Sequence, residues 1–138
     1  MKRYILFLTT MFLILGGTAK AQEFNSNKNN YLVFSKNILQ LKPTLLTASE
    51  LAIEDGDKHG EFYIVICGKT VSDIANNTEF NELLKQAKMQ NVRVFACGLS
   101  LDQFSVSPDQ LPNDIDTIDN GILYGLQLTR EGFITLTI

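Results

Sequence analysis

One continuous stretch of this sequence, Phe62 to Cys67, contains only β-branched, aromatic and other apolar residues. Such a run predicts a strand covered on both faces, because a strand with one face in water alternates apolar and polar residues. A second run, Val92 to Cys97, has the same character and is interrupted only by Arg93. Two strands of this kind need helices on both sides of one sheet, which constrains the chain to an α/β fold.

Helical patterns separate the predicted strands. Apolar residues recur at helical spacing after Pro43 until Asp55-Gly56 ends the pattern, and a second stripe runs from Phe80 to Ala87. The other predicted strands are residues 31–34, 115–118 and 133–138, with a last helix at 122–129. Strands that alternate with helices predict βαβ units, and therefore a three-layer α/β/α fold with a mostly parallel five-stranded sheet.

The amino terminus has the pattern of an export signal. A basic start, an apolar run over residues 4–15 and the sequence Ala19-Lys20-Ala21 predict a signal peptide at 1–21. The run is shorter than the roughly 20 residues that a membrane span requires, so an uncleaved anchor is the less favoured alternative. We expect an exported protein, periplasmic or secreted, free of the membrane after cleavage. A flexible, Asn-rich leader at 22–30 then precedes one domain at 31–138.

The charge of the predicted mature chain argues against two classes of partner. Removing Lys2, Arg3 and Lys20 leaves 12 − 3 = 9 basic residues against 15 acidic ones, a net charge of −6. A surface of this sign repels phosphate groups, so nucleic acid and anionic membranes are not expected partners.

Both buried runs end in the same pair of residues, Cys67-Gly68 and Cys97-Gly98. In open α/β sheets the carboxyl ends of the strands are where ligands and reacting groups gather, and turn amides there can stabilise a thiolate. Either sulfur could be a nucleophile or carry a transferred sulfur atom as a persulfide. Two alternatives stay open: the cysteines are simply small buried hydrophobic residues, or they form a structural disulfide between neighbouring strands.

Other polar residues fall at the same predicted edge. Lys69 follows Cys67-Gly68 and is a candidate for binding an anion or lowering a thiol pKa, while Asn120-Gly121 is turn chemistry that opens the last helix. His59, the only histidine, lies in a polar turn at the opposite edge and is expected to be solvated. Cysteine and a single histidine cannot supply an ordinary metal site, so neither a metal nor another cofactor is predicted.

Several segments together resemble the DsrE/DsrF-like family. They are residues 90–98, which end in Ala96-Cys97-Gly98; Leu111-Pro112; residues 118–121; Glu131 to Ile134; and, upstream, residues 64–71. The similarity covers most of residues 31–138 and lies in strand ends and turns.

The resemblance implies a three-layer domain around a parallel five-stranded sheet, usually assembled as homotrimers or hexamers. In sulfur-relay members a cysteine at the position of Cys97 accepts a persulfide and passes it to a partner protein. Cys67 is a candidate second thiol by its position alone, and Gly68, Lys69, Gly98, Asn120 and Gly121 are candidate ligand-binding residues. The sequence leaves open whether the chain catalyses a reaction, since the alternative is a non-catalytic, oligomeric ligand-binding or assembly module of the cell envelope.

Overall fold

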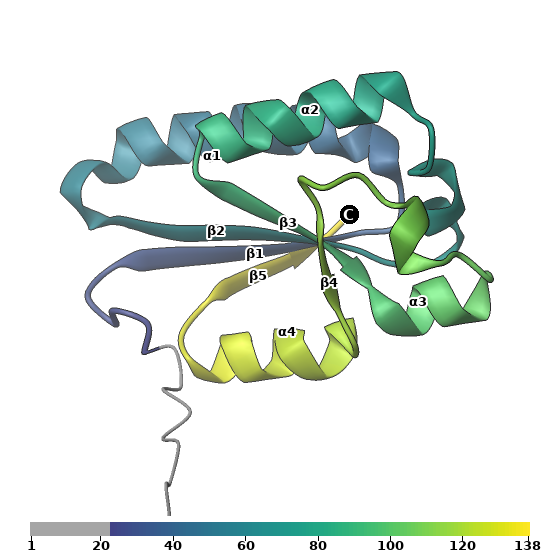
Figure 1. The fold of residues 1–138 in the computed structure, drawn as a ribbon. Coiled ribbons are helices and arrows are strands. Elements are labelled where there is room, and N and C mark those ends of the chain that lie inside the picture. Colours follow the sequence, from purple (N-terminus) through teal and green to yellow (C-terminus); the bar gives the residue numbers. More distant parts are fainter. Residues whose placement is uncertain (1–22) are drawn as a thin grey trace, which may run out of the picture.

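The computed structural model describes residues 23–138, which form one five-stranded sheet with helices on both faces (Figure 1). All strand pairs are parallel, in the order β4-β3-β2-β1-β5. This confirms the predicted α/β/α fold with a parallel sheet. The strands are β1 (Asn29–Ser35), β2 (His59–Ile66), β3 (Val92–Cys97), β4 (Asp116–Ile118) and β5 (Ile134–Thr137).

Helices α1 (Leu41–Asp55) and α2 (Thr78–Met89) cover one face of the sheet (Figure 1). Their buried stripes pack on alternate residues of β1, β2 and β3 to form the larger of two hydrophobic clusters. Ile64, at the centre of that cluster, pairs with Val33 on one side and Val94 on the other. The apolar run that predicted a central strand is therefore the middle of the sheet.

Helix α3 (Gly98–Gln103) follows β3 at the carboxyl end of the sheet, and its buried Leu101 joins the larger cluster. Helix α4 (Gly121–Arg130) lies on the opposite side of the sheet from α1 and α2 (Figure 1). The cluster on this side is smaller and more aromatic, with Tyr63, Phe95 and Phe133 in edge-to-face or tilted contacts. Short 3₁₀ turns connect the main elements: η1 (Ile38–Gln40), η2 (Gly56–Lys58), η3 (Lys69–Asp73) and η4 (Pro108–Gln110).

The residues that precede the predicted first strand pack against the domain. Phe24 packs edge-to-face on Phe133, and β1 begins at Asn29, two residues before the predicted strand. The early start has a polar cause: the side chain of Asn30 is buried, and its Oδ1 accepts a 2.8 Å hydrogen bond from the backbone N–H of Glu61. The predicted signal peptide at 1–21 lies outside the described residues. No helix within residues 23–138 has the length and apolar character needed to cross a membrane.

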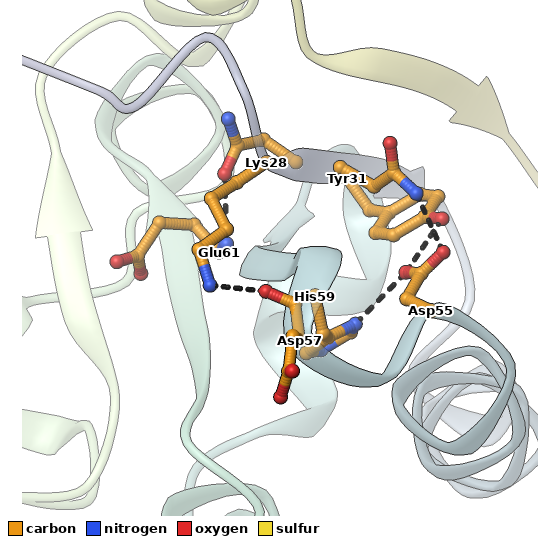
Figure 2. A network of polar contacts seen from close by, with 8 residues as sticks. Lys28, Tyr31, Asp55, Asp57, His59 and Glu61 are labelled. Carbon is orange, nitrogen blue, oxygen red and sulfur yellow. Dashed lines mark hydrogen bonds and ion pairs between the residues drawn. The ribbon is translucent and has the colours of Figure 1, made fainter.

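Asp55 ties together three elements at the amino-terminal edge of the sheet (Figure 2). Its carboxylate accepts hydrogen bonds from Asn29 Nδ2 at 2.6 Å and Tyr31 Oη at 2.9 Å, and it pairs with His59 Nδ1 at 3.1 Å. His59 is thus partly buried in a hydrogen-bond contact with Asp55, which corrects the expectation of a solvated loop residue, because η2 folds it back onto the end of α1.

The same contacts shift two pKa values. The Asn29 amide, helped by His59 and Tyr31, holds the pKa of Asp55 below its usual range despite partial desolvation. Burial, together with the hydrogen bond to Asp55, raises the pKa of Tyr31 to about 12. The pKa of Asp55 is lower in the folded chain than in the unfolded one. The contacts of this carboxylate therefore stabilise the fold at pH values above the unfolded pKa, and their contribution is lost as the pH falls through the folded pKa.

Candidate thiol site at the carboxyl edge of the sheet

The two cysteines lie side by side at the carboxyl ends of adjacent strands. The β2–β3 ladder ends with Ile66 opposite Ala96, so Cys67 and Cys97 are the next pair in the register. Both are free thiols. Cys97 is only 3% exposed, whereas Cys67 is half-buried at the rim. The parallel sheet therefore joins two residues that are far apart in sequence into one thiol pair.

The sulfur of Cys97 lies among hydrogen-bond donors although it is buried. The backbone N–H groups of Ser100 and Gly121, the Ser100 hydroxyl and the Cys67 thiol lie close enough to favour a negative charge on it, and the first turn of α4 approaches the sulfur so closely that a Cβ at Gly121 would lie 3.1 Å from it. Ser100 Oγ also accepts a 2.8 Å hydrogen bond from the N–H of Gly68, so its own proton remains available to the sulfur. We call this set, Ser100, Gly121 and Cys67 around the Cys97 sulfur, the thiol cradle.

The cradle gives the two thiols opposite character. Burial disfavours a charge on Cys97, but the cradle donors outweigh it and hold the pKa of Cys97 below the ordinary thiol value. Burial, the neighbouring sulfur and the hydrogen bond that Cys67 donates to it raise the pKa of Cys67 to about 12. Cys97 is thus the more acidic thiol of the pair, and Cys67 is the one that keeps its proton.

The three glycines of the site serve different physical needs. Gly98 has to be small, since a Cβ there would lie 2.8 Å from the carbonyl oxygen of Asp119. At Gly121 a Cβ would lie 3.1 Å from the sulfur of Cys97, so the missing side chain lets the first turn of α4 touch the thiol. Gly68 has a φ of +76°, a backbone conformation that favours glycine and that points its N–H at Ser100.

The candidate ligand-binding residues take supporting positions. The Oδ1 of Asn120 accepts a 3.0 Å hydrogen bond from the N–H of Leu123 and so caps α4, which leaves the N–H of Gly121 directed at sulfur. Lys36, the residue after β1, has a charge that favours the thiolate of Cys67. Lys69 begins η3, in the turn that follows Cys67-Gly68.

We predict that Asn120→Ala destabilises the fold by about 1 kcal/mol, the usual cost of removing an N-cap, and also slows alkylation of Cys97, because α4 then holds Gly121 less firmly. The matched control is Asn77→Ala, which removes the equivalent cap of α2, a 3.0 Å bond to the N–H of Phe80. Chemical denaturation should show similar losses for both variants, and thiol alkylation should slow only in Asn120→Ala. Equal alkylation rates would show that the cap does not position the cradle.

Ser100 is the site residue that sequence reasoning missed. It lies three residues after Cys97 in the first turn of α3, where its backbone N–H and its hydroxyl both reach back to the sulfur. The signal available in the sequence was a hydroxyl residue one helical turn beyond a cysteine at a strand end. That signal is weak without knowing that α3 begins immediately at Gly98.

A surface hollow lies at the amino-terminal end of β3, away from the thiol pair. It has a volume of about 550 Å³ and is lined by Glu61, Lys88, Arg93, Asp114 and Asp116, among others. Its two cations form the ion pairs Lys88–Asp114 and Arg93–Asp116, and Glu61 adds a third carboxylate, so the lining carries more acidic than basic groups. Among residues 23–138 no three His, Cys, Asp or Glu side chains gather to hold a metal ion.

Three solved structures share the fold. They are a protein of unknown function, MTH1491, from Methanobacterium thermoautotrophicum (TM-score 0.61, 19% identity, covering 80% of this chain and 100% of that one); a conserved protein of unknown function, BT1422, from Bacteroides thetaiotaomicron (0.58, 18%, 83% and 99%); and the ychN protein from E. coli (0.54, 16%, 79% and 99%). At these identities the similarity establishes the fold alone. No protein-family model matches the chain, and neither does any curated protein.

Proposed function

We propose that this protein is an exported, DsrE/DsrF-like persulfide carrier in which Cys97 accepts and holds a sulfur atom. The observation that carries the proposal is the cradle: one buried sulfur that the first turn of α4 approaches at Gly121, with polar hydrogens of Ser100, Gly121 and Cys67 near enough to favour its negative charge. A thiol that is only a small core residue needs no such set of donors. The shared three-layer fold and the position at the carboxyl ends of parallel strands support the same proposal.

The loading step is a nucleophilic transfer of sulfane sulfur. The Cys97 thiolate attacks the terminal sulfur of a persulfide or polysulfide donor, R–S–SH, and forms Cys97–S–SH while R–S⁻ leaves with the bonding electron pair. The cradle donors stabilise the thiolate before the attack and again when it is released by an acceptor, because thiolate is the leaving group of that second transfer. Since Cys97 is nearly inaccessible, the donor sulfur enters past the half-exposed Cys67.

Mass spectrometry tests the proposal. After anaerobic incubation with inorganic polysulfide, wild type should gain one sulfur atom that peptide mapping places on Cys97, and Cys97→Ser should gain none. Cys67→Ser is the matched control, because it removes a thiol of the same pair and should still be loaded at Cys97. Sulfur found on Cys67 with Cys97 unmodified would overturn the proposal.

A second candidate is a non-catalytic assembly or ligand-binding module, favoured by apolar side chains that stay exposed on α4 and β5, namely Ile122, Leu123, Leu126, Ile134 and Leu136. Under this alternative, copies of the chain associate through these side chains, in the manner of the homo-oligomers that the family resemblance implies, and Cys97→Ser is indistinguishable from wild type. The carrier proposal adds partners of another kind, a sulfur-donor and a sulfur-acceptor protein. Loading of Cys97 in the experiment above separates the two candidates.

A further inference from the structure

Cys67 does not itself accept sulfur in the proposed loading step, yet it lies against the sulfur that is loaded. Adjacent strands of a sheet are about 4.8 Å apart, and residues opposite each other on neighbouring strands fall within the Cα separation of roughly 4.4–6.8 Å that a disulfide tolerates. Cys67 and Cys97 follow directly on the last paired residues of β2 and β3, and both side chains pack in the same hydrophobic cluster on one face of the sheet. The pair can therefore close into a disulfide with little movement of the backbone.

The burial of the two residues separates their roles. A persulfide on Cys97 is enclosed by α3, α4 and the aromatic cluster, so a bulky acceptor cannot approach its sulfur without opening the site. The thiol of Cys67 is inside the same enclosure on one side and at the rim on the other. Among the described residues it is the one thiol besides Cys97, and the strand register makes it the neighbour of Cys97.

We propose that Cys67 resolves the Cys97 persulfide, releasing sulfide and closing a Cys67–Cys97 disulfide, so that the protein reduces sulfane sulfur as well as carrying it. This inference rests on the proposed function, because it acts on the persulfide that Cys97 acquires. Cys67 is then a catalytic residue for release, in contact with the reacting atom.

The step balances as Cys67–SH + Cys97–S–SH → Cys67–S–S–Cys97 + H₂S. The Cys67 sulfur attacks the inner sulfur of the persulfide, a new S–S bond forms, and the old one breaks with its electron pair going to the outer sulfur. The proton of Cys67 moves to that departing sulfur. Sulfane sulfur is reduced to sulfide and the two cysteine sulfurs are oxidised, so each turnover requires a reducing dithiol to reopen the disulfide.

The protonated state of Cys67 fits this order of events. With its pKa raised to about 12, Cys67 forms little thiolate and is a poor nucleophile toward the donor, so sulfur is loaded on Cys97 first. Cys67 becomes reactive only when Cys97 carries a persulfide, because the departing outer sulfur can then take the proton of Cys67. An acceptor protein is not needed for release in this scheme.

The test uses the whole purified protein, loaded anaerobically with inorganic polysulfide and freed of excess reagent by desalting. A sulfide electrode should then record release of about one sulfide per loaded chain. Intact mass should fall to that of the reduced protein minus two hydrogen atoms, with the two cysteine peptides linked. Dithiothreitol should restore the reduced mass and allow a second round of loading.

Cys67→Ser and Cys67→Ala separate this inference from the proposed function. Both variants should take up sulfur on Cys97 and keep it, with sulfide release slowed at least tenfold; two substitutions at a half-exposed position guard against a folding defect in one. Release from either variant at the wild-type rate would overturn the role of Cys67 while leaving the carrier intact. Failure to load Cys97 in the two Cys67 variants, which have no resolving thiol, would instead overturn the proposed function. Linked peptides without released sulfide would show air oxidation and refute the resolving step.

Discussion

Replacing Ser100 with alanine is expected to slow alkylation of Cys97 by about three- to tenfold at a pH below its pKa, because a hydrogen bond to a charged group contributes about 1.5–3 kcal/mol. The variant loses the hydroxyl donor to sulfur, so the pKa of Cys97 rises and less thiolate is present. The remaining thiolate is intrinsically more nucleophilic, which offsets part of the loss. The rate should be measured against pH with a thiol-specific reagent in Cys67→Ser, so that only Cys97 reports.

The pH profile distinguishes a positioning role from a general loss of structure. In Ser100→Ala the midpoint of the profile should move to higher pH, while the limiting rate at high pH stays equal or increases. A fold that merely loosened would expose Cys97 and raise the rate at every pH. Ser72→Ala is the matched control, since Ser72 is exposed in η3 and its removal should leave the midpoint unchanged. An unshifted midpoint in a folded Ser100→Ala would show that the hydroxyl does not act on sulfur.

Parallel strands explain why the sequence was informative about the thiol pair. Each Cys-Gly pair ends an apolar run, and in a parallel sheet all such ends lie on one edge, so local patterns were sufficient to bring Cys67, Cys97 and Asn120-Gly121 together. The structure places them at that edge, with Gly121 against the Cys97 sulfur. Pattern and topology together predicted the neighbourhood without any detail of packing.

The polarity of the site could not be predicted in the same way. Whether a cysteine at a strand end is a buried hydrophobic residue or a stabilised thiolate depends on the direction of a few N–H and O–H groups. Here that direction is set by Gly68, which orients Ser100 across 32 residues of sequence, and by the cap at Asn120. The cation near the thiol could not be predicted for the same reason. The sequence indicated Lys69, which is close to Cys67 along the chain, whereas the pairing of β1 with β2 brings Lys36 close to Cys67.

Ile64→Ala, in the central strand β2, should lower the free energy of unfolding by about 2–5 kcal/mol. This is a large share of the roughly 5–15 kcal/mol by which an ordinary domain is stable. Ile64 is fully buried between α1, α2 and its neighbours Val33 and Val94. Removing its outer carbons leaves a cavity that a sheet held on both sides cannot collapse to fill. The measurement is urea denaturation followed by circular dichroism, at equal protein concentration for all variants.

Ile53→Ala is the matched control, with the same change in side chain at a position that is 84% exposed on α1. Its effect should stay within about 0.5 kcal/mol, as for most surface substitutions. Because the thiol cradle is built from the ends of β2 and β3 and the turns that follow them, loss of the sheet centre should also release Cys97 to alkylation at a urea concentration matching the loss of structure. If Cys97 became reactive well before the sheet unfolded, the cradle would be a locally opening unit rather than part of the core, and a donor could enter without disturbing the strands.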